Sequence, residues 1–141
     1  MSYTAPEAAR IADISYRQLD YWDRTGLISP SKCQAHGSGS RRAYSYRDLV
    51  ELRIVKTMID AGIYLAAARK VMSVVRSYPN LDLTRTTLVF TSDTVRLCDQ
   101  GDLVEIVRNE QSMINVIPLG GIMASLDVIL HEELMPVVAR R

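Results

Sequence analysis

The chain has 141 residues, of which 48% are apolar, and its formal net charge is +1. This length suits one ordinary domain, or two small ones that share a core, and the apolar content excludes wholesale disorder. No apolar run is long enough to span a bilayer and the N-terminus lacks a signal-peptide core, so we expect a cytoplasmic protein with no membrane partner.

The charge is divided unevenly along the chain. Residues 1–77 carry 12 Lys and Arg against 7 Asp and Glu, a net charge of +5, whereas residues 78–141 carry 5 against 9, a net charge of −4. A basic half joined to an acidic half indicates that only the first half meets a polyanion such as DNA. Chance scatter of surface charge gives the same distribution, so charge alone does not decide between the two.

Three helix starts in the first half have a hydroxyl that can cap the first turn and a partner three residues later that favours it. These pairs are Thr4 with Glu7, Ser15 with Gln18 and Ser45 with Asp48. The first helix is predicted over residues 5–12 and the second over residues 15–25, with Gly26 at its end. Two short helices joined by a tight turn are typical of a helix-turn-helix.

A β-hairpin is predicted next, with strands at residues 27–30 and 41–44 and a flexible tip at residues 37–39. A hairpin in this place would be a wing. The third helix is predicted over residues 46–61 and the fourth over residues 64–77.

After Pro79 the pattern changes to short strands, predicted at residues 88–91, 95–98, 103–107 and 113–117, with a hairpin turn at residues 99–102. A last amphipathic helix is predicted over residues 119–134. The fold class is therefore α+β: residues 1–77 form a winged helix-turn-helix of four helices plus a wing hairpin, and residues 78–141 form a small antiparallel β region with a C-terminal helix. The second part is interpreted as a dimerisation module, a ligand sensor or a cover for the first core.

The second helix presents a polar row to solvent. On a helical wheel Leu19 faces the core while Arg17, Tyr21 and Arg24 point away, with Gln18 to one side. Arg can bridge guanine acceptors, Gln can pair with adenine, and Tyr can donate to a phosphate. The same row is also typical of a solvated face that touches nothing.

The wing adds Lys32, Arg41 and Arg42, which are expected to neutralise phosphates, while Tyr44 is expected mainly to pack the wing against the helices. The full set of candidate DNA-binding residues is Ser15, Tyr16, Arg17, Gln18, Asp20, Tyr21, Arg24, Lys32, Arg41, Arg42 and Tyr44.

The sequence gives little support for metal binding, cofactor binding or catalysis. Cys33 and Cys98 are far apart, and Cys33 with His36 lacks the further ligands of a tetrahedral set, so neither a metal site nor a cofactor is predicted. The sequence has no phosphate loop, no nucleophile elbow and no catalytic triad at motif spacing. An enzyme is therefore not expected.

Three segments of the first half follow a specific order and spacing: Tyr3-Thr4, then Ser15-x-Arg17-x-Leu19-x-Tyr21-Trp22-Asp23-Arg24-x-Gly26-Leu27-Ile28-x-Pro30, then Arg42-x-Tyr44-Ser45-x-x-Asp48-Leu49. This pattern resembles the MerR family of regulators over roughly residues 3–76. The resemblance implies a second helix in the major groove, a wing on the DNA backbone and dimers on paired half-sites. It also implies base or phosphate contacts for Arg17 and Tyr21 and a wing contact for Arg42.

The sequence departs from the family in three ways. Asp20 stands where a basic residue is common, and its carboxylate can accept from cytosine or pair with Arg17 or Arg24. Pro79 stops the long helix that forms the family's usual antiparallel coiled coil. The cysteine clusters of metal and redox sensors are missing, and the part after Pro79 is similar to actinobacterial MerR-like regulators with a compact strand-rich tail.

The predicted function is sequence-specific binding of double-stranded DNA by a homodimeric, nucleoid-associated transcription regulator. The resemblance implies RNA polymerase as a partner, through distortion of a promoter spacer, and repression by occlusion fits the residues equally well. The sequence does not identify a small-molecule effector. The alternatives are an excisionase-like architectural factor and a protein-interaction module that has lost DNA binding.

Overall fold

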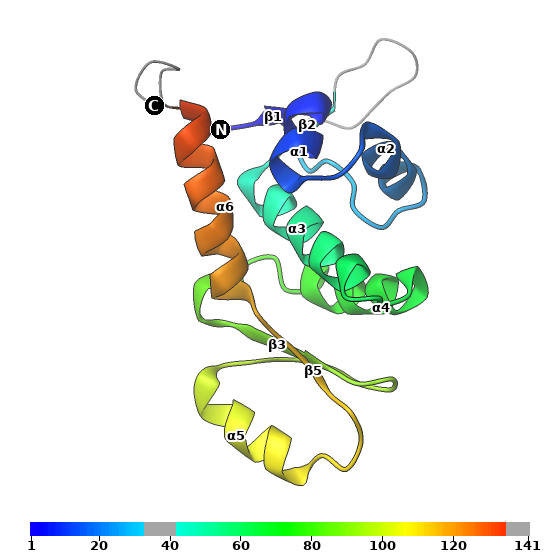
Figure 1. Cartoon of the computed structure of the whole chain (residues 1–141), viewed down its shortest axis with the longest axis vertical. Coiled ribbons are helices and arrows are strands. Elements are labelled where there is room, and N and C mark those ends of the chain that lie inside the picture. The colour runs from blue at the N-terminus through cyan, green and yellow to red at the C-terminus, as the bar shows by residue number, and fades with distance from the viewer. Residues whose placement is uncertain (33–41, 135–141) are drawn as a thin grey trace.

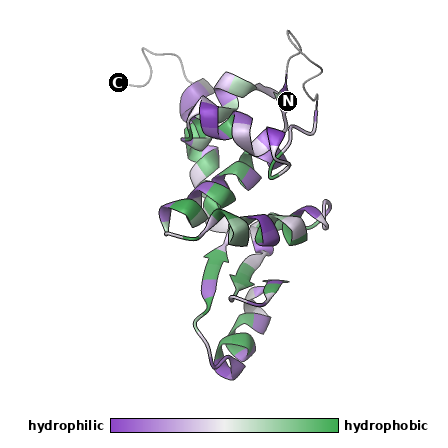
Figure 2. Cartoon of the chain, turned by 90° about the vertical axis from the view of Figure 1, so that its right-hand side faces the viewer, coloured by the Kyte–Doolittle hydropathy of each residue, from purple (hydrophilic) through white to green (hydrophobic). Residues whose placement is uncertain are grey.

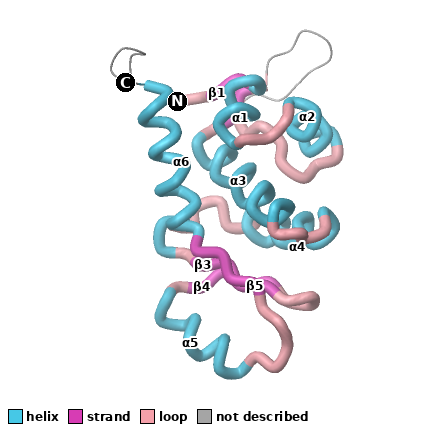
Figure 3. Tube along the Cα trace, viewed as in Figure 1, coloured by secondary structure: helices cyan, strands magenta, loops and turns pink. Residues whose placement is uncertain are grey.

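The computed structural model describes residues 1–32 and 42–134 and contains both helices and short strands (Figures 1 and 3). The helices are α1 (Ala5–Ala12), α2 (Tyr16–Arg24), α3 (Tyr46–Asp60), α4 (Leu65–Arg76), α5 (Gln100–Asn109) and α6 (Leu119–Leu134), with a 3-10 helix η1 (Leu83–Arg85). The strands are β1 (Tyr3–Thr4), β2 (Ala43–Tyr44), β3 (Thr87–Phe90), β4 (Val95–Cys98) and β5 (Asn115–Pro118). This combination confirms the predicted α+β class. None of the helices described has the length and apolar character needed to cross a membrane.

Helices α1, α2 and α3 begin at the capping residues that the sequence indicates. The hydroxyls of Thr4, Ser15 and Ser45 each accept the N–H of the third helical residue, whose side chain in turn accepts the N–H of the capping residue. Each cap therefore satisfies two backbone amides near the helix start. Asp13, in the left-handed conformation with a φ of 59°, ends α1 and turns the chain into α2.

Strand β2 has a different partner from the one predicted. It pairs antiparallel with β1, with Tyr3 opposite Tyr44 and Thr4 opposite Ala43. Residues 27–30 are not assigned as a strand, and one backbone bond, from the N–H of Lys32 to the carbonyl of Ala43 (3.0 Å), connects this segment to β2. The predicted wing tip, residues 37–39, lies outside the described residues.

The three strands β3, β4 and β5 form an antiparallel sheet in the order β4–β3–β5. The prediction of a strand at residues 103–107 is wrong, because these residues belong to α5. Asp99 is the reason: instead of opening a hairpin turn, its carboxylate accepts the N–H of Asp102 (3.1 Å) and caps a helix. A five-residue segment with four apolar residues fits either structure by periodicity, so the cap decides.

Helix α6 returns beside α1 and α3 and packs against both (Figure 1). Leu119 and Leu126 of α6 are fully buried in the same core cluster as Leu49 and Leu52 of α3. Leu88 of β3 joins this cluster from the sheet. One hydrophobic core therefore includes residues from both halves of the chain.

The contact between α6 and η1 leads to a prediction at two adjacent glycines. A Cβ at Gly120 would lie 2.6 Å from the carbonyl oxygen of Thr84, whereas a Cβ at Gly121 would meet no atom within 4 Å. We expect Gly120→Ala to lower the free energy of unfolding by about 1–3 kcal/mol, because the backbone of η1 must move away. Gly121→Ala is the matched control and should be neutral or raise it by up to about 1 kcal/mol. Urea denaturation of both variants measures the difference, and equal stabilities would contradict the close contact.

Candidate nucleic-acid interface

The second helix, α2, is held in place by two buried side chains on one face. Leu19 is completely buried and Trp22 is 4% exposed. After the helix, Gly26 adopts a positive φ of 78°, and the N–H groups of Leu27 and Ile28 bond back to the carbonyl of Trp22 (2.9 and 3.3 Å). This tight return fixes both the end of α2 and the direction in which its other face points.

The opposite face of α2 carries the polar row that the wheel predicts. Arg17 and Gln18 are exposed, and the side chain of Arg24 is 65% exposed. Tyr16 and Tyr21 are 53% and 46% exposed, so two phenol rings flank the cations. Donors of this kind suit the acceptors of DNA bases and phosphates.

Asp20 compensates two cations at this surface. Its carboxylate accepts the Nε–H of Arg24 at 2.9 Å and a terminal N–H of Arg42 at 2.5 Å. Arg42 also pairs through Nε with Asp23 at 2.9 Å. The hydrogen bond from Arg42, followed by that from Arg24, holds the pKa of Asp20 below its usual value. The prediction that Asp20 pairs with Arg24 is confirmed, and the pairing with Arg42 is an addition.

The geometry corrects the role proposed for Arg42 and removes Tyr44 from the candidate DNA-contact residues. The Arg42 side chain is only 12% exposed and lies between two carboxylates, so it ties β2 to α2 and its charge is compensated within the chain. Tyr44 is completely buried, which removes it from the contact surface, and burial raises the pKa of its phenol. Its predicted packing role is the one that the structure supports.

The other candidate side chains differ in whether they are available to contact DNA or are already used in hydrogen bonds within the chain. Arg17 and Tyr21 are exposed, as is Lys32 at the start of the wing. The Ser15 hydroxyl and the side-chain amide oxygen of Gln18 both accept backbone N–H groups in the α2 cap, although the Gln18 side chain remains exposed. Arg41, together with Cys33 and His36, lies outside the described residues.

Several residues that position this surface were not anticipated from the sequence. Arg69 of α4 donates to the carbonyl and the hydroxyl of Thr25, at 3.0 and 2.7 Å, and so caps the C-terminal end of α2. Asp48 accepts from both the N–H and the hydroxyl of Ser31, at 2.8 and 2.7 Å, which fixes the base of the wing. These contacts join residues 44 and 17 positions apart, and no short-range sequence signal marks them.

The described part of the chain contains no cluster of three His, Cys, Asp or Glu side chains that could hold a metal ion. Cys98 is a free, partly buried thiol, and burial raises its pKa. A thiol with a raised pKa is less reactive at neutral pH than an ordinary one.

A family model described as MerR HTH family regulatory protein matches residues 3–74 of this chain. An uncharacterized HTH-type transcriptional regulator of Mycobacterium tuberculosis is 39% identical over 117 residues, which is 82% of this chain and 52% of that protein. The HTH-type transcriptional regulator GlnR of Bacillus cereus is 29% identical over 62 residues, covering 44% of this chain and 45% of GlnR. The chain thus spans about half the length of the curated relatives it matches.

Two solved structures are also similar. HiNmlR, a MerR family regulator that lacks the sensor domain and is bound to promoter DNA, has a TM-score of 0.45 and 22% identity, over 55% of this chain and 56% of that one. A MerR family transcriptional regulator from Bacillus cereus has a TM-score of 0.44 and 16% identity, over 94% of this chain and 99% of that one.

Proposed function

Because the chain belongs to the MerR HTH family of regulatory proteins, we propose that it binds double-stranded DNA sequence-specifically and regulates transcription. The family consists of transcriptional regulators rather than enzymes. In this proposal α2 enters the major groove, the wing contacts the DNA backbone, and two copies bind paired half-sites. Residues 1–77 bind DNA and residues 78–141 supply dimerisation.

The observation that carries this proposal is the exposed face of α2. Arg17, Tyr21 and Arg24 project from a helix whose other face is anchored by Leu19 and Trp22. A rigid helix with outward donors can hold them at a fixed spacing against base edges, which sequence reading requires. Lys32, at the start of the wing, adds a cation for the phosphates.

Asp20 determines how much of the binding we expect to come from base contacts and how much from attraction to phosphates. Because it compensates Arg24 and Arg42, Arg17 is the cation of α2 that makes no ion pair within the described residues. Binding should therefore depend on a small number of phosphate contacts and have a shallow salt dependence. The same compensation favours the second candidate function, a protein-interaction module that has lost DNA binding.

Promoter action follows from DNA binding in one of two ways. Dimers that distort a promoter spacer would let RNA polymerase engage it, and dimers that cover a promoter would block polymerase. Run-off transcription from a promoter carrying the bound site distinguishes them, since added protein raises transcript yield in the first case and lowers it in the second.

The decisive experiment is selection of bound duplexes from a random DNA pool with the full chain, followed by sequencing. An enriched inverted repeat is the expected result. A direct repeat would indicate head-to-tail binding, as in an architectural factor of the excisionase type. No enrichment from a folded protein would overturn the proposal and favour the interaction module.

A further inference from the structure

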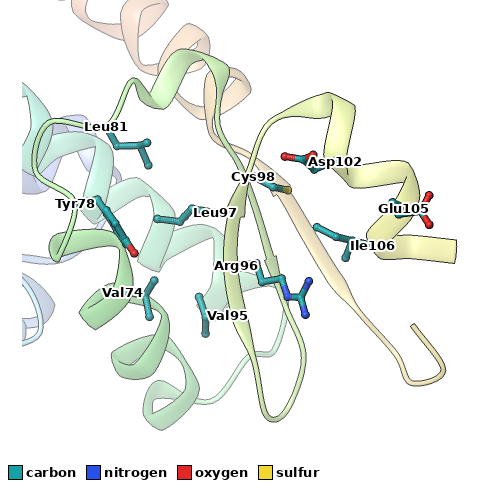
Figure 4. A pocket seen from close by; sticks show the side chains of 10 residues that line it. All are labelled: Val74, Tyr78, Leu81, Val95, Arg96, Leu97, Cys98, Asp102, Glu105 and Ile106. Carbon is teal, nitrogen blue, oxygen red and sulfur yellow. The ribbon is translucent and has the colours of Figure 1, made fainter. Parts of the chain in front are cut away.

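A cleft of about 610 Å³ lies at the free edge of β4 (Figure 4). All four residues of β4 line it, and since successive residues of a strand point to opposite faces, the cleft must follow the strand edge. One wall comes from α4 and the segment after it, with Val74, Tyr78 and Leu81. The other wall comes from α5, on the opposite side of β4 in Figure 4.

The backbone groups at this edge can be identified from the turn between β3 and β4. The N–H of Thr91 bonds to the carbonyl of Thr94 (2.9 Å), so this opposite pair is hydrogen-bonded. In an antiparallel ladder bonded and non-bonded pairs alternate, and therefore Arg96 bonds to β3 while Val95 and Leu97 direct their N–H and C=O groups outward. Within the described residues β4 pairs with β3 alone, so these outward groups have no strand partner.

The side chains beside the edge are largely apolar, among them Val74, Leu81 and Ile106. Tyr78, which also lines the cleft, is 55% exposed. Figure 2 colours the strands of the sheet largely as apolar. The opposite edge strand, β5, ends at Pro118, which has no N–H to offer another strand, whereas β4 has no such block.

Three charged side chains line the cleft: Arg96, Asp102 and Glu105. Arg96 projects from β4 on the side of α5, and Asp102 lies in the first turn of α5 (Figure 4). Both residues are exposed, and neither takes part in an ion pair within the part of the chain described. A partner that fits here should therefore supply both an acid and a base at matching positions.

We propose that β4 pairs with β4 of a second copy of this chain, joining two three-stranded sheets across a two-fold axis. A second copy is self-complementary, because it offers the same outward backbone groups, the same apolar strand residues Val95 and Leu97, and both a base and an acid beside the edge. A register centred on Leu97 keeps the two Arg96 side chains apart and brings each next to the partner's first turn of α5, where Asp102 lies. The partner's Val95 and Leu97 then cover Tyr78.

This inference deepens the proposed dimeric DNA binding. The β4 edge and α5 lie at the far end of the molecule from α1 and α2 (Figure 1), so a dimer formed there leaves both copies of α2 free to face DNA. It also gives the chain a route to a dimer that does not need the long helix stopped by Pro79.

The test is a charge exchange, measured by sedimentation equilibrium of the full chain without DNA. Arg96→Glu and Asp102→Arg should each raise the dimer dissociation constant by at least about tenfold, and the double variant should recover most of the loss. Lys70→Glu and Glu132→Arg are matched controls that change charge at exposed positions outside the cleft, on α4 and α6, and should leave dimerisation unchanged. A folded wild-type chain that stays monomeric, or a double variant no better than the singles, would overturn the proposal.

Amide hydrogen exchange gives a second readout that does not depend on variants. The Leu97 N–H should become more protected as protein concentration rises, while the Arg96 N–H, already bonded to β3, should be protected throughout. Equal concentration dependence at both positions would place the interface elsewhere. Binding of the wild-type chain to a duplex with one half-site separates the two proposals. A chain that dimerises but does not bind this duplex defeats the DNA-binding function, whereas a chain that binds it but stays monomeric defeats the interface.

Discussion

Replacing Glu51 by alanine is expected to lower the free energy of unfolding by about 3–5 kcal/mol, because it removes one partner from a buried ionic network. Glu51 lies on α3 with its side chain only 4% exposed. It pairs with Arg47 and with Arg76, each at 3.0 Å. Burial raises the pKa of Glu51, while the two arginines act in the opposite direction. Without the carboxylate, Arg47 would lose its ion-pair partner and Arg76 would keep only the longer ion pair with Asp48 (3.8 Å).

The cost is large because the same arginines hold other parts of the fold. Arg47 donates to the carbonyls of Val75, Tyr78 and Pro79 at 3.1–3.2 Å, which satisfies groups left open at the end of α4. Arg76 donates to the carbonyl of Ser29 at 3.3 Å, at the base of the wing. Disturbing Glu51 should therefore loosen both the end of α4 and the wing.

The same helix provides the control. Lys56 and Asp60 form a pair at the same four-residue spacing (3.2 Å), but Asp60 is 59% exposed, so Asp60→Ala should change stability by no more than about 1 kcal/mol. Denaturant unfolding of both variants measures the contrast. Similar losses for Glu51→Ala and Asp60→Ala would show that burial of the network contributes little.

Local chemistry made much of the helical half predictable from sequence. The capping pairs at Thr4, Ser15 and Ser45 mark helix starts because the interacting groups lie three residues apart. Gly26 and Gly62 mark helix ends because glycine readily adopts the positive φ that both residues have in the structure. Signals of this range need no knowledge of the tertiary fold.

The misassigned elements depend on longer-range interactions or on ambiguous patterns. The segment over residues 103–107 is rich in β-branched residues, which favours a strand, but the cap at Asp99 and the one-sided placement of Leu103 and Ile106 favour a helix. The pairing of β2 with β1 joins residues about forty positions apart, and no periodicity specifies such a partner.

The candidate site shows the same difference between features set within one helix and features set by contacts between elements. The wheel correctly separated the buried Leu19 from the exposed Arg17, because both lie on one helix. It could not show that Arg42 lies between Asp20 and Asp23, because that contact forms only when β2 packs against α2. Ion pairs between elements therefore cannot be predicted from the pattern of a single helix.

Reversing the charge at Arg17 should have the largest effect on DNA binding. Truncation to alanine is expected to cost about 1–3 kcal/mol at the cognate site, through loss of base or phosphate contacts. Arg17→Glu should weaken binding by more than about a hundredfold, because a carboxylate then faces the phosphates as well. Arg17 is exposed and makes no ion pair in the described residues, so its replacement disturbs no internal partner.

The measurement is fluorescence anisotropy on the selected duplex and on a scrambled one, at several salt concentrations. Lys70→Glu makes the same change of net charge at an exposed position on α4 and is the matched control. If Arg17 reads bases, Arg17→Ala weakens cognate binding more than scrambled binding. Equal losses on both duplexes would restrict Arg17 to the phosphates, and equal losses for Arg17→Glu and Lys70→Glu would mean that overall charge, rather than the face of α2, governs binding.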